Sequence, residues 1–595
     1  MSDIELKYKW DLTKFCKSCE DCETKLKEVS NEVKDLLKYK GTLNEPKNLL
    51  AYWQDTYKLY DKMENCYVYA FANLHTDFGS QIYNELSQKA ESVQTLLNSE
   101  LSFAEAEIKI LGKDYLQKLL NMKEFLDWRQ VIELNIARLE HTLTEKEEKI
   151  LAFTNEIGNG FTAIKDSCCN TDIKFEDALD SKGISHKVTE GNMSGYFKSQ
   201  DRVLRKNVSI SQKNALEKYS YTLTSNFIYH IKFVSNVASL RGFKSVLDST
   251  FLGSKMTKDV FDNIINCVDS HQDILTDILK TKKKISGYDT IYNYDLYLDM
   301  DKSNKVYTFE EGIDIVKKAT SILGEDYVKL IDRAVEERWI DVYPAENKMS
   351  GGYCWGTYGK THIVLLNWTG TLDDVFTLAH ELGHAIQHYL MDKKHKVQEE
   401  RQYMYFEETA SLFNEVILSQ YLLEQSIDEK EKLGLLDEKC TKIMGTMFRQ
   451  TEFSKFENYC YDTIFNGGQL TRETLIAKWR ECRFLPYESV VDMSNFTDLT
   501  WQGLWHFFAL SYYVWQYSFA FMIAQYFAGN ILSKQKDAVS KYFDFISTSG
   551  CEYPLDLMKR LGADITSKDF YENAFKYFRK NCDEYMDCAE KFFKK

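Results

Sequence analysis

Apolar residues recur along most of the chain with the 3.6-residue spacing of amphipathic α-helices. The pattern is nearly unbroken from about residue 44 to residue 143, where aromatic and leucine side chains recur among charged ones. The 595 residues include only 4 prolines and are rich in Lys, Glu and Leu. Because proline breaks helices and those three residues favour them, the sequence predicts a mainly α-helical protein.

One stretch interrupts this pattern. Between about Gly183 and Ser199, glycines cluster with small polar residues, which is typical of a boundary. We expect it to separate an N-terminal helical region, residues 1–190, from a catalytic region, residues 191–595. The chain has ample length for a large core, and it contains no repeat of fixed period.

The pattern changes again from residue 361 onward. Residues 361–367 are typical of a strand, and residues 368–370 of a turn. Thr371 is a good N-cap residue, Asp374 lies three residues later as in a capping box, and apolar residues then keep helical spacing. The sequence therefore predicts a strand, a turn and a capped helix.

This helix carries one His-Glu-x-x-His sequence, residues 380–384. His380 and His384 are one helical turn apart, about 6 Å along the axis, so both imidazoles can bind one tetrahedral metal ion. Glu381 points about a quarter-turn away, where it can accept a proton from a zinc-bound water that attacks a peptide carbonyl. The motif predicts a zinc-peptidase site, the alternative being a chance match on a core helix.

A catalytic zinc ion needs a further protein ligand. His388 continues the stripe but lies about 12 Å along the axis from His380, so we interpret it as a pocket residue that supports the ligands. Metzincins carry their third histidine at the position that Leu390 occupies here, which excludes that class.

The better candidates lie in residues 406–415. On a helix packed against the first, Glu408 and Glu415 share one face. Glu408 can then bind the metal, and Glu415 can hold a ligating histidine through its other ring nitrogen. The alternative is a solvated acidic helix face, which the apolar neighbours on that face disfavour.

These segments closely resemble oligoendopeptidase F, of the thimet-oligopeptidase-like zinc metallopeptidase family. The resemblance implies one Zn²⁺ per chain on His380, His384 and Glu408, in a zincin-like site with Glu as the third ligand. It also implies a mainly α fold with two helical halves that enclose a deep channel for oligopeptides, and a small β-sheet beside the zinc-binding helix. The matching segments are residues 351–353, 362–367, 372–384, 408–411 and 414–415, with further similarity at 10–12, 294–297 and 338–343.

Residues 505–517 resemble the family's segment of a histidine followed by tyrosines, which faces the zinc. By this resemblance His506 and Tyr513 stabilise the oxyanion, since a tetrahedral intermediate needs hydrogen-bond donors. The gap after His506 is one residue longer than the family pattern, so Tyr512 and Tyr517 stay open as alternatives and are assigned to substrate binding. An aromatic-rich core helix is the other interpretation.

Gly351, Gly352 and Tyr353 form a further candidate for substrate binding. Glycines allow a peptide backbone to approach closely, and the strand that follows could pair with an extended substrate at its edge. A plain glycine turn is the alternative.

Charge and composition set further expectations. The net charge of −15 without a basic stripe disfavours nucleic acid and anionic membranes as partners. The apolar run at residues 512–532 carries interspersed Gln, Ser and Asn and no flanking basic cluster, so we interpret it as a buried core helix.

Fourteen cysteines are present, three of them at Cys16, Cys19 and Cys22. The fourth position of an iron–sulfur run is Leu26, which disfavours a cluster. The first residues lack the apolar core of a signal peptide, so we expect reduced thiols in a cytoplasmic protein.

The sequence thus predicts a zinc-dependent endopeptidase that cuts short oligopeptides. Two rivals remain: a zinc exopeptidase of a related helical fold, and a catalytically silent scaffold that keeps a structural metal. Intact Glu381 argues against the scaffold, because a structural site has no use for a base beside an open coordination position. His/Glu ligands also admit other divalent ions.

Overall fold

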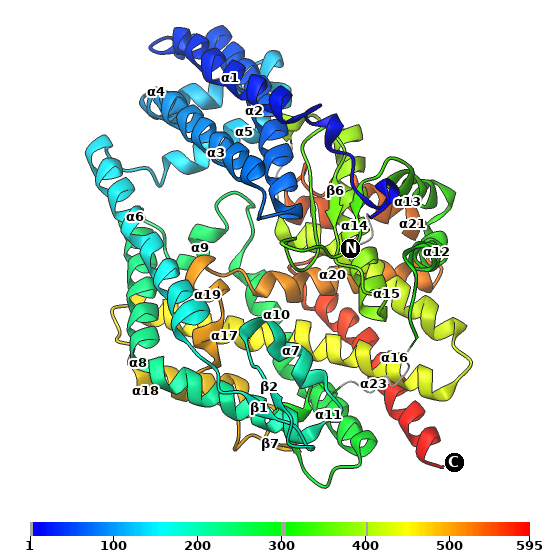
Figure 1. Cartoon of the computed structure of the whole chain (residues 1–595). Helices are drawn as coiled ribbons and strands as arrows, with labels where there is room; N and C mark the ends of the chain where they lie inside the picture. The colour runs from blue at the N-terminus through cyan, green and yellow to red at the C-terminus, as the bar shows by residue number, and fades with distance from the viewer. Residues whose placement is uncertain (1–3, 299–304, 400–402, 595) are drawn as a thin grey trace. The chain divides into compact units, whose positions relative to one another are not determined.

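The protein is mainly helical, as predicted. The computed structural model describes residues 4–298, 305–399 and 403–594 (Figure 1). Helices occupy most of these residues, and the strands are only two or three residues long. The chain forms two compact units, each assembled from three separate segments: unit 1 from residues 1–142, 305–421 and 530–557, and unit 2 from residues 143–304, 422–529 and 558–595.

Unit 1 combines an N-terminal group of helices with the helices of the predicted metal site. Among the N-terminal helices, α1, α2 and α3 pack against one another, as do α4 and α5. Unit 1 contains α1 (Cys19–Leu36), α2 (Pro46–Thr76), α3 (Gln81–Leu101), α4 (Phe103–Leu119), α5 (Arg129–Leu139), α12 (Phe309–Thr320), α13 (Glu325–Glu336), α14 (Leu372–Lys394), most of α15 (Met404–Gln425) and α21 (Ala538–Ile546).

Unit 2 is built around α8 and α17, which pack against each other, and α23, which packs on α16 and α11. Besides α15, the helices α20 (Trp515–Leu532) and α22 (Pro554–Arg560) also have residues in both units. The helices of unit 2 are α6 (Glu145–Ser167), α7 (Glu190–Lys198), α8 (Arg202–Leu240), α9 (Val246–Thr250), α10 (Lys258–Ser270), α11 (Gln272–Ser286), α16 (Glu429–Ile443), α17 (Arg449–Phe465), α18 (Arg472–Arg483), α19 (His506–Ala509) and α23 (Lys568–Lys594). Its strands form pairs, β1 (Ala178–Leu179) with β2 (Ser185–His186) and β3 (Ile291–Tyr292) with β7 (Val491–Asp492).

A three-stranded sheet in unit 1 lies beside α14. Its order is β4 (Ile340–Asp341), β6 (Ile363–Leu365), β5 (Tyr353–Trp355), with β6 parallel to β4 and antiparallel to β5. The residues of β6 are fully buried, as expected for a central strand, whereas β5 forms an edge. The small sheet predicted beside the motif helix is therefore present.

The predicted boundary lies inside unit 2. Helix α7 begins at residue 190 and follows the β1–β2 pair, so both sides of the boundary belong to that unit. The division into residues 1–190 and 191–595 stays a prediction about the chain.

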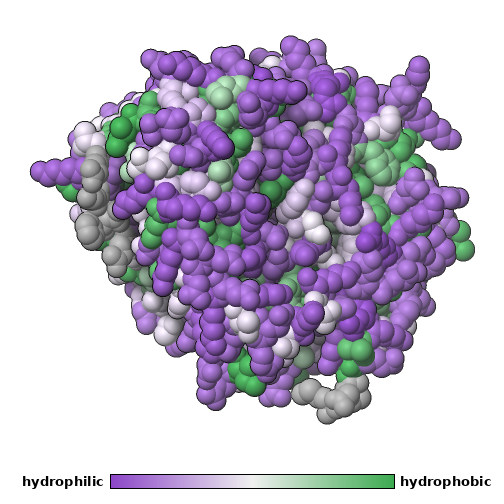
Figure 2. Space-filling view, turned by 90° about the horizontal axis from the view of Figure 1, so that it is seen from above, coloured by the Kyte–Doolittle hydropathy of each residue, from purple (hydrophilic) through white to green (hydrophobic). Residues whose placement is uncertain are grey.

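The apolar run that ends at residue 532 forms α20, and most of its side chains are buried, as predicted for a core helix. Among the described residues, no helix has the length and apolar character that crossing a membrane requires. On the face shown in Figure 2, hydrophilic residues cover most of the surface, and hydrophobic ones form small separate patches.

Candidate active site

Helix α14 begins at the predicted cap. Thr371 Oγ1 accepts a hydrogen bond from the Asp374 backbone N–H at 3.3 Å, and the Asp374 carboxylate accepts the N–H groups of Thr369, Gly370 and Thr371. Gly370 has φ of +94°, a conformation that glycine adopts without strain. The capping box therefore fixes where α14 starts, and with it the direction in which the motif residues point.

The backbones of α14 and α15 touch at Gly383. A Cβ atom on Gly383 would lie 2.7 Å from both the Ala410 carbonyl oxygen and Ser411 Cα, closer than real Cβ atoms approach. A glycine in the middle of a helix costs about 1 kcal/mol relative to alanine, so its presence inside the motif already points to a close contact. This glycine is therefore a sequence signal for the contact between the two helices.

Asn414 fastens the same two helices. Its Nδ2 donates to the Ala379 carbonyl at 2.9 Å, and its Oδ1 accepts the Tyr327 hydroxyl at 2.9 Å. All three residues are buried, so these bonds form away from water. The predicted packing of residues 406–415 against the motif helix is confirmed, and it brings Glu408 to the two histidines.

Three candidate ligand atoms converge between α14 and α15. His380 Nε2 lies 3.3 Å from His384 Nε2 and 3.6 Å from Glu408 Oε2, and His384 Nε2 lies 4.0 Å from Glu408 Oε2. Ligands about 2.0–2.1 Å from a tetrahedral zinc ion stand about 3.3 Å apart. Two imidazoles and one carboxylate at these separations therefore fit Zn²⁺ with a position left open.

Neighbouring side chains hold these candidate ligands in place. Glu415 Oε1 lies 2.7 Å from His380 Nδ1, and Ser411 Oγ donates to Glu408 Oε2 at 3.2 Å. Burial and the nearby imidazoles lower the pKa of His384 well below its usual value. The lowered pKa favours the neutral imidazole, which is the form that binds metals.

His388 lies one turn beyond His384 but is not one of the three converging residues. Its ring stacks on His362 with centroids 4.9 Å apart, and burial lowers its pKa. Its placement agrees with a role beside the ligands, and that role stays a prediction.

Glu381 is buried next to the ligand cluster, with 6% of its surface exposed. Desolvation raises its pKa to about 7; Glu408 adds to this rise and His380 opposes it. A carboxylate with such a pKa exchanges a proton readily near neutral pH, which suits a general base that later acts as an acid.

The segment of Gly351, Gly352 and Tyr353 runs along the edge of the sheet next to Glu381. A Cβ atom on Gly352 would lie 3.5 Å from Glu381 Oε1. Gly351 has φ of +83°, and its carbonyl accepts the Asn367 side-chain amide at 2.8 Å. The segment that leads into β5, an edge strand, is thus close to the motif, and an extended peptide could pair with the open edge of that strand.

Tyr353 is anchored by a residue that sequence reasoning missed. Its hydroxyl lies 2.8 Å from Nδ1 of His75, which belongs to α2. The two residues are 278 positions apart, so no local sequence signal connects them.

In unit 2, the structure brings together His506, Tyr513 and Tyr517. The His506 ring stacks on Tyr513 with centroids 5.3 Å apart, and the Tyr517 ring meets both rings edge-on. Burial lowers the pKa of His506, and Lys165 adds to this effect. This aromatic group contains two of the three tyrosines that the sequence left open.

Tyr512 points elsewhere. It is 1% exposed, its hydroxyl donates to Asn458 Oδ1 at 3.0 Å, and its ring stacks on Tyr461. Its φ of +54° turns the chain between Tyr512 and Tyr513, so successive tyrosines face different surroundings. This placement favours a packing role for Tyr512 over the predicted role in substrate binding.

Comparison with known proteins decides the family. The sequence profile of peptidase family M3 matches residues 196–577, and that of oligopeptidase F matches residues 107–175. The chain belongs to peptidase family M3. The match to this family of metalloendopeptidases confirms the resemblance seen in the sequence. The protein is therefore a metallopeptidase that hydrolyses peptides.

Curated relatives match nearly the whole length of this chain. It is 30% identical over 593 residues to oligopeptidase PepF of Bacillus subtilis, covering 98% of this chain and 87% of the relative. It is 29% identical to group B oligopeptidase PepB of Streptococcus agalactiae, covering 99% and 98%. The crystal structure of oligoendopeptidase-F from Enterococcus faecium has the same fold, with a TM-score of 0.75 at 24% identity over 96% of this chain and 99% of that one.

Proposed function

We propose that this M3 peptidase is a zinc-dependent endopeptidase that hydrolyses internal bonds of short oligopeptides in the cytoplasm. The observation that carries the proposal is the position of Glu381, a buried carboxylate directly beside the converging ligand atoms of His380, His384 and Glu408. A metal site built only for stability has no need of a base at that place.

The residues of this site divide the chemistry between them. His380, His384 and Glu408 hold the ion, and Glu415 fixes the orientation of His380. When bound, Zn²⁺ supplies a Lewis acid that polarises a carbonyl and lowers the pKa of water. Glu381 accepts a proton from the attacking water and transfers it to the nitrogen of the departing amine.

Further residues act on the substrate. The outer edge of β5, with Gly351, Gly352 and Tyr353, pairs with the extended peptide. His506 and Tyr513 donate hydrogen bonds to the oxyanion, and Tyr517 contacts the peptide. The support for Tyr513 is its stacking on His506, which Tyr512 does not share.

Two peptide substrates and a chelator test the proposal. The first peptide is blocked at both ends and carries a fluorophore and a quencher on either side of its centre, and the second has the same sequence with free ends. We expect both to be cut internally, the chelator to abolish cleavage, and added Zn²⁺ to restore it. Trimming of the free-ended peptide alone would indicate an exopeptidase, and cleavage that persists in the chelator would exclude a metal mechanism.

A further inference from the structure

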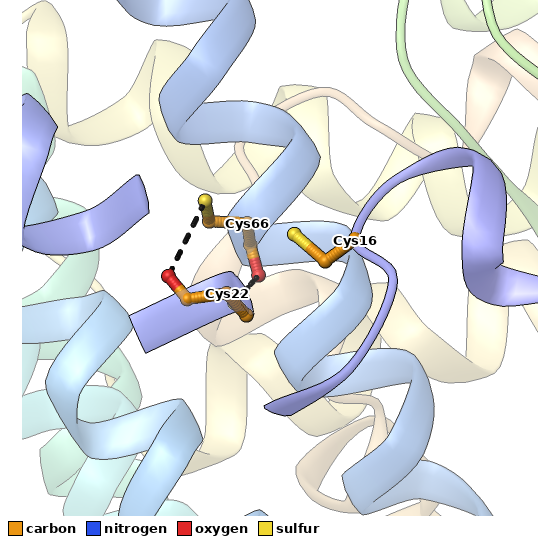
Figure 3. Close-up of side chains that lie close together, drawn as sticks. All are labelled: Cys16, Cys22 and Cys66. Carbon is orange, nitrogen blue, oxygen red and sulfur yellow. Dashed lines mark hydrogen bonds between the residues drawn. The ribbon is translucent and has the colours of Figure 1, made fainter. Parts of the chain in front are cut away.

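Three cysteines gather in the core of unit 1, in the N-terminal group of helices. The sulfur atoms of Cys16, Cys22 and Cys66 all lie within 4.8 Å of one another. Figure 3 shows the three side chains together, Cys22 on α1, Cys66 on α2 and Cys16 on the segment before α1. All three have an exposed fraction of 0%, so they form a closed cluster inside the protein.

The cluster differs from the one that sequence spacing suggests. Cys19 belongs to the same Cys-x-x-Cys-x-x-Cys run, but it is only half-buried, and its sulfur lies 4.0 Å from the Tyr69 hydroxyl. Cys66 completes the group from α2, 44 residues after Cys22. The packing of α1 against α2 creates this arrangement, and the spacing of the run does not.

The separation of the three sulfur atoms suits a metal ion. Zinc–sulfur bonds are about 2.3 Å long, so thiolates on one tetrahedral ion stand about 3.8 Å apart, and the three sulfur atoms here lie within 4.8 Å of one another. The present contacts of two thiols are long: Cys22 Sγ donates to the Cys66 carbonyl at 3.6 Å, and Cys66 Sγ donates to the Cys22 carbonyl at 3.9 Å. Because thiols are weak hydrogen-bond donors, forming metal–sulfur bonds would break only weak hydrogen bonds.

Positive charge lies next to the cluster. Lys25 Nζ donates to the carbonyl of Phe15, the residue before Cys16, at 3.1 Å, although it also pairs with Asp21 at 2.9 Å. Cys22 lies at the start of α1, whose N-terminus is capped by Ser18 and carries a partial positive charge. Both features favour thiolates here, and they oppose the neighbouring Cys16 thiol and the burial that raise the pKa of Cys22 and Cys66.

We propose that Cys16, Cys22 and Cys66 form a three-thiolate site for a thiophilic metal ion of the zinc class, separate from the active site. Thiolate ligands select such ions over hard cations such as Mg²⁺ and Ca²⁺. The ion joins the segment before α1 to α1 and α2. Helix α2 also contacts the sheet region: Asn65 Oδ1 accepts the Thr357 hydroxyl at 3.1 Å, and His75 Nδ1 lies 2.8 Å from the Tyr353 hydroxyl. By fixing α2, the bound ion therefore stabilises the helix that supports β5.

Cadmium is a suitable probe, because bonds between cadmium and thiolate sulfur absorb in the ultraviolet. Reduced full-length protein, loaded with zinc at its active site, is titrated with Cd²⁺, and X-ray absorption counts the sulfur ligands. We expect one Cd²⁺ per chain with three sulfur ligands. The ultraviolet absorption of the cadmium–thiolate bonds should be lost in Cys66→Ser. It should be retained in two matched controls: Cys19→Ser, from the same Cys-x-x-Cys-x-x-Cys run, and Cys267→Ser, which replaces a cysteine beside a histidine and a glutamate in unit 2.

A second measurement needs no variant, in case Cys66→Ser does not fold. Native wild-type protein is alkylated with and without Cd²⁺, and the modified peptides are read by mass. We expect Cd²⁺ to slow alkylation of Cys16, Cys22 and Cys66 together by about tenfold or more, and to leave Cys19 unchanged. Cadmium bound only through nitrogen and oxygen, a signal that survives Cys66→Ser, or protection that omits these three cysteines would overturn the proposal.

Discussion

Glu415 Oε1 lies 2.7 Å from Nδ1 of His380, across the contact between α15 and α14. A carboxylate at this distance accepts the Nδ1 proton, so the other ring nitrogen, Nε2, is left as the ligand atom. That nitrogen is the one that faces His384 and Glu408. Glu415 therefore sets both the tautomer and the orientation of His380, a proposed metal ligand, without being one of the proposed ligands itself.

Glu415→Gln should weaken zinc binding by about 10- to 100-fold, because the amide is a poorer acceptor for the His380 proton. Activity should return when zinc is added in excess, which a lost catalytic group would not allow. Competition with a chromophoric chelator measures the affinity. The control is Glu424→Gln, an exposed position in the last turn of the same helix, and an equal loss there would contradict the role of Glu415.

Gly383→Ala should force α14 and α15 apart. The added methyl group meets the Ala410 carbonyl and Ser411 Cα at 2.7 Å, and neither belongs to a flexible side chain. We expect the free energy of unfolding to fall by about 1–3 kcal/mol and zinc affinity to fall with it. Gly195→Ala is the control, since a Cβ on this α7 glycine meets nothing within 4 Å and should stabilise the protein by up to about 1 kcal/mol.

Substitution of single tyrosines separates the catalytic from the packing role. Tyr513→Phe should lower kcat by about 10²- to 10³-fold with little change in KM, because the hydroxyl acts on the transition state. Tyr512→Phe should leave kcat unchanged and cost about 1 kcal/mol of stability, because its hydroxyl donates to Asn458 inside the core. A larger loss of kcat in Tyr512→Phe than in Tyr513→Phe would reverse the assignment.

Glu457 should make stability depend on pH. Burial raises its pKa from 4.5 to about 8, while Oε1 accepts the Tyr512 backbone N–H at 2.8 Å and Oε2 has no hydrogen-bond partner among the described residues. The folded state then binds the proton more tightly than the unfolded state, so this group's contribution to stability is present below about pH 4.5 and is lost as pH rises to about 8.

The measurement compares denaturant unfolding of the wild type and Glu457→Gln across this pH range. We expect the variant to lose the pH-dependent fall, a difference on the order of a few kcal/mol between the two ends. Glu488→Gln, at an exposed position, serves as the control and should follow the wild type. Parallel curves for Glu457→Gln and the wild type would contradict the raised pKa.

The sequence predicted those parts of the site that local spacing determines. The cap at Thr371, the helix through residues 380–384 and the shared face of Glu408 and Glu415 follow from helix geometry, and the structure contains each of them. The packing of the second helix against the first was also predicted, because apolar neighbours on the face of Glu408 and Glu415 favour an inward face over a solvated one.

Contacts between distant segments could not be predicted in this way. Nothing near Tyr353 in the sequence points to His75, and the Cys-x-x-Cys-x-x-Cys spacing drew attention to Cys19, whereas Cys66 joins the cluster. Local periodicity also does not predict side-chain directions where the backbone turns. Tyr512 has a positive φ and its side chain lies in the core, but tyrosine at that position does not indicate such a turn.

The central claim is that Glu381 transfers the proton while His380, His384 and Glu408 hold the metal. The most direct test is Glu381→Gln, a substitution that keeps the size of the side chain and removes its ability to accept a proton. Zinc content and kcat on the blocked, quenched peptide are measured on the same sample. We predict full zinc content with kcat reduced by about 10²- to 10⁴-fold. Full zinc content with undiminished kcat would contradict the account.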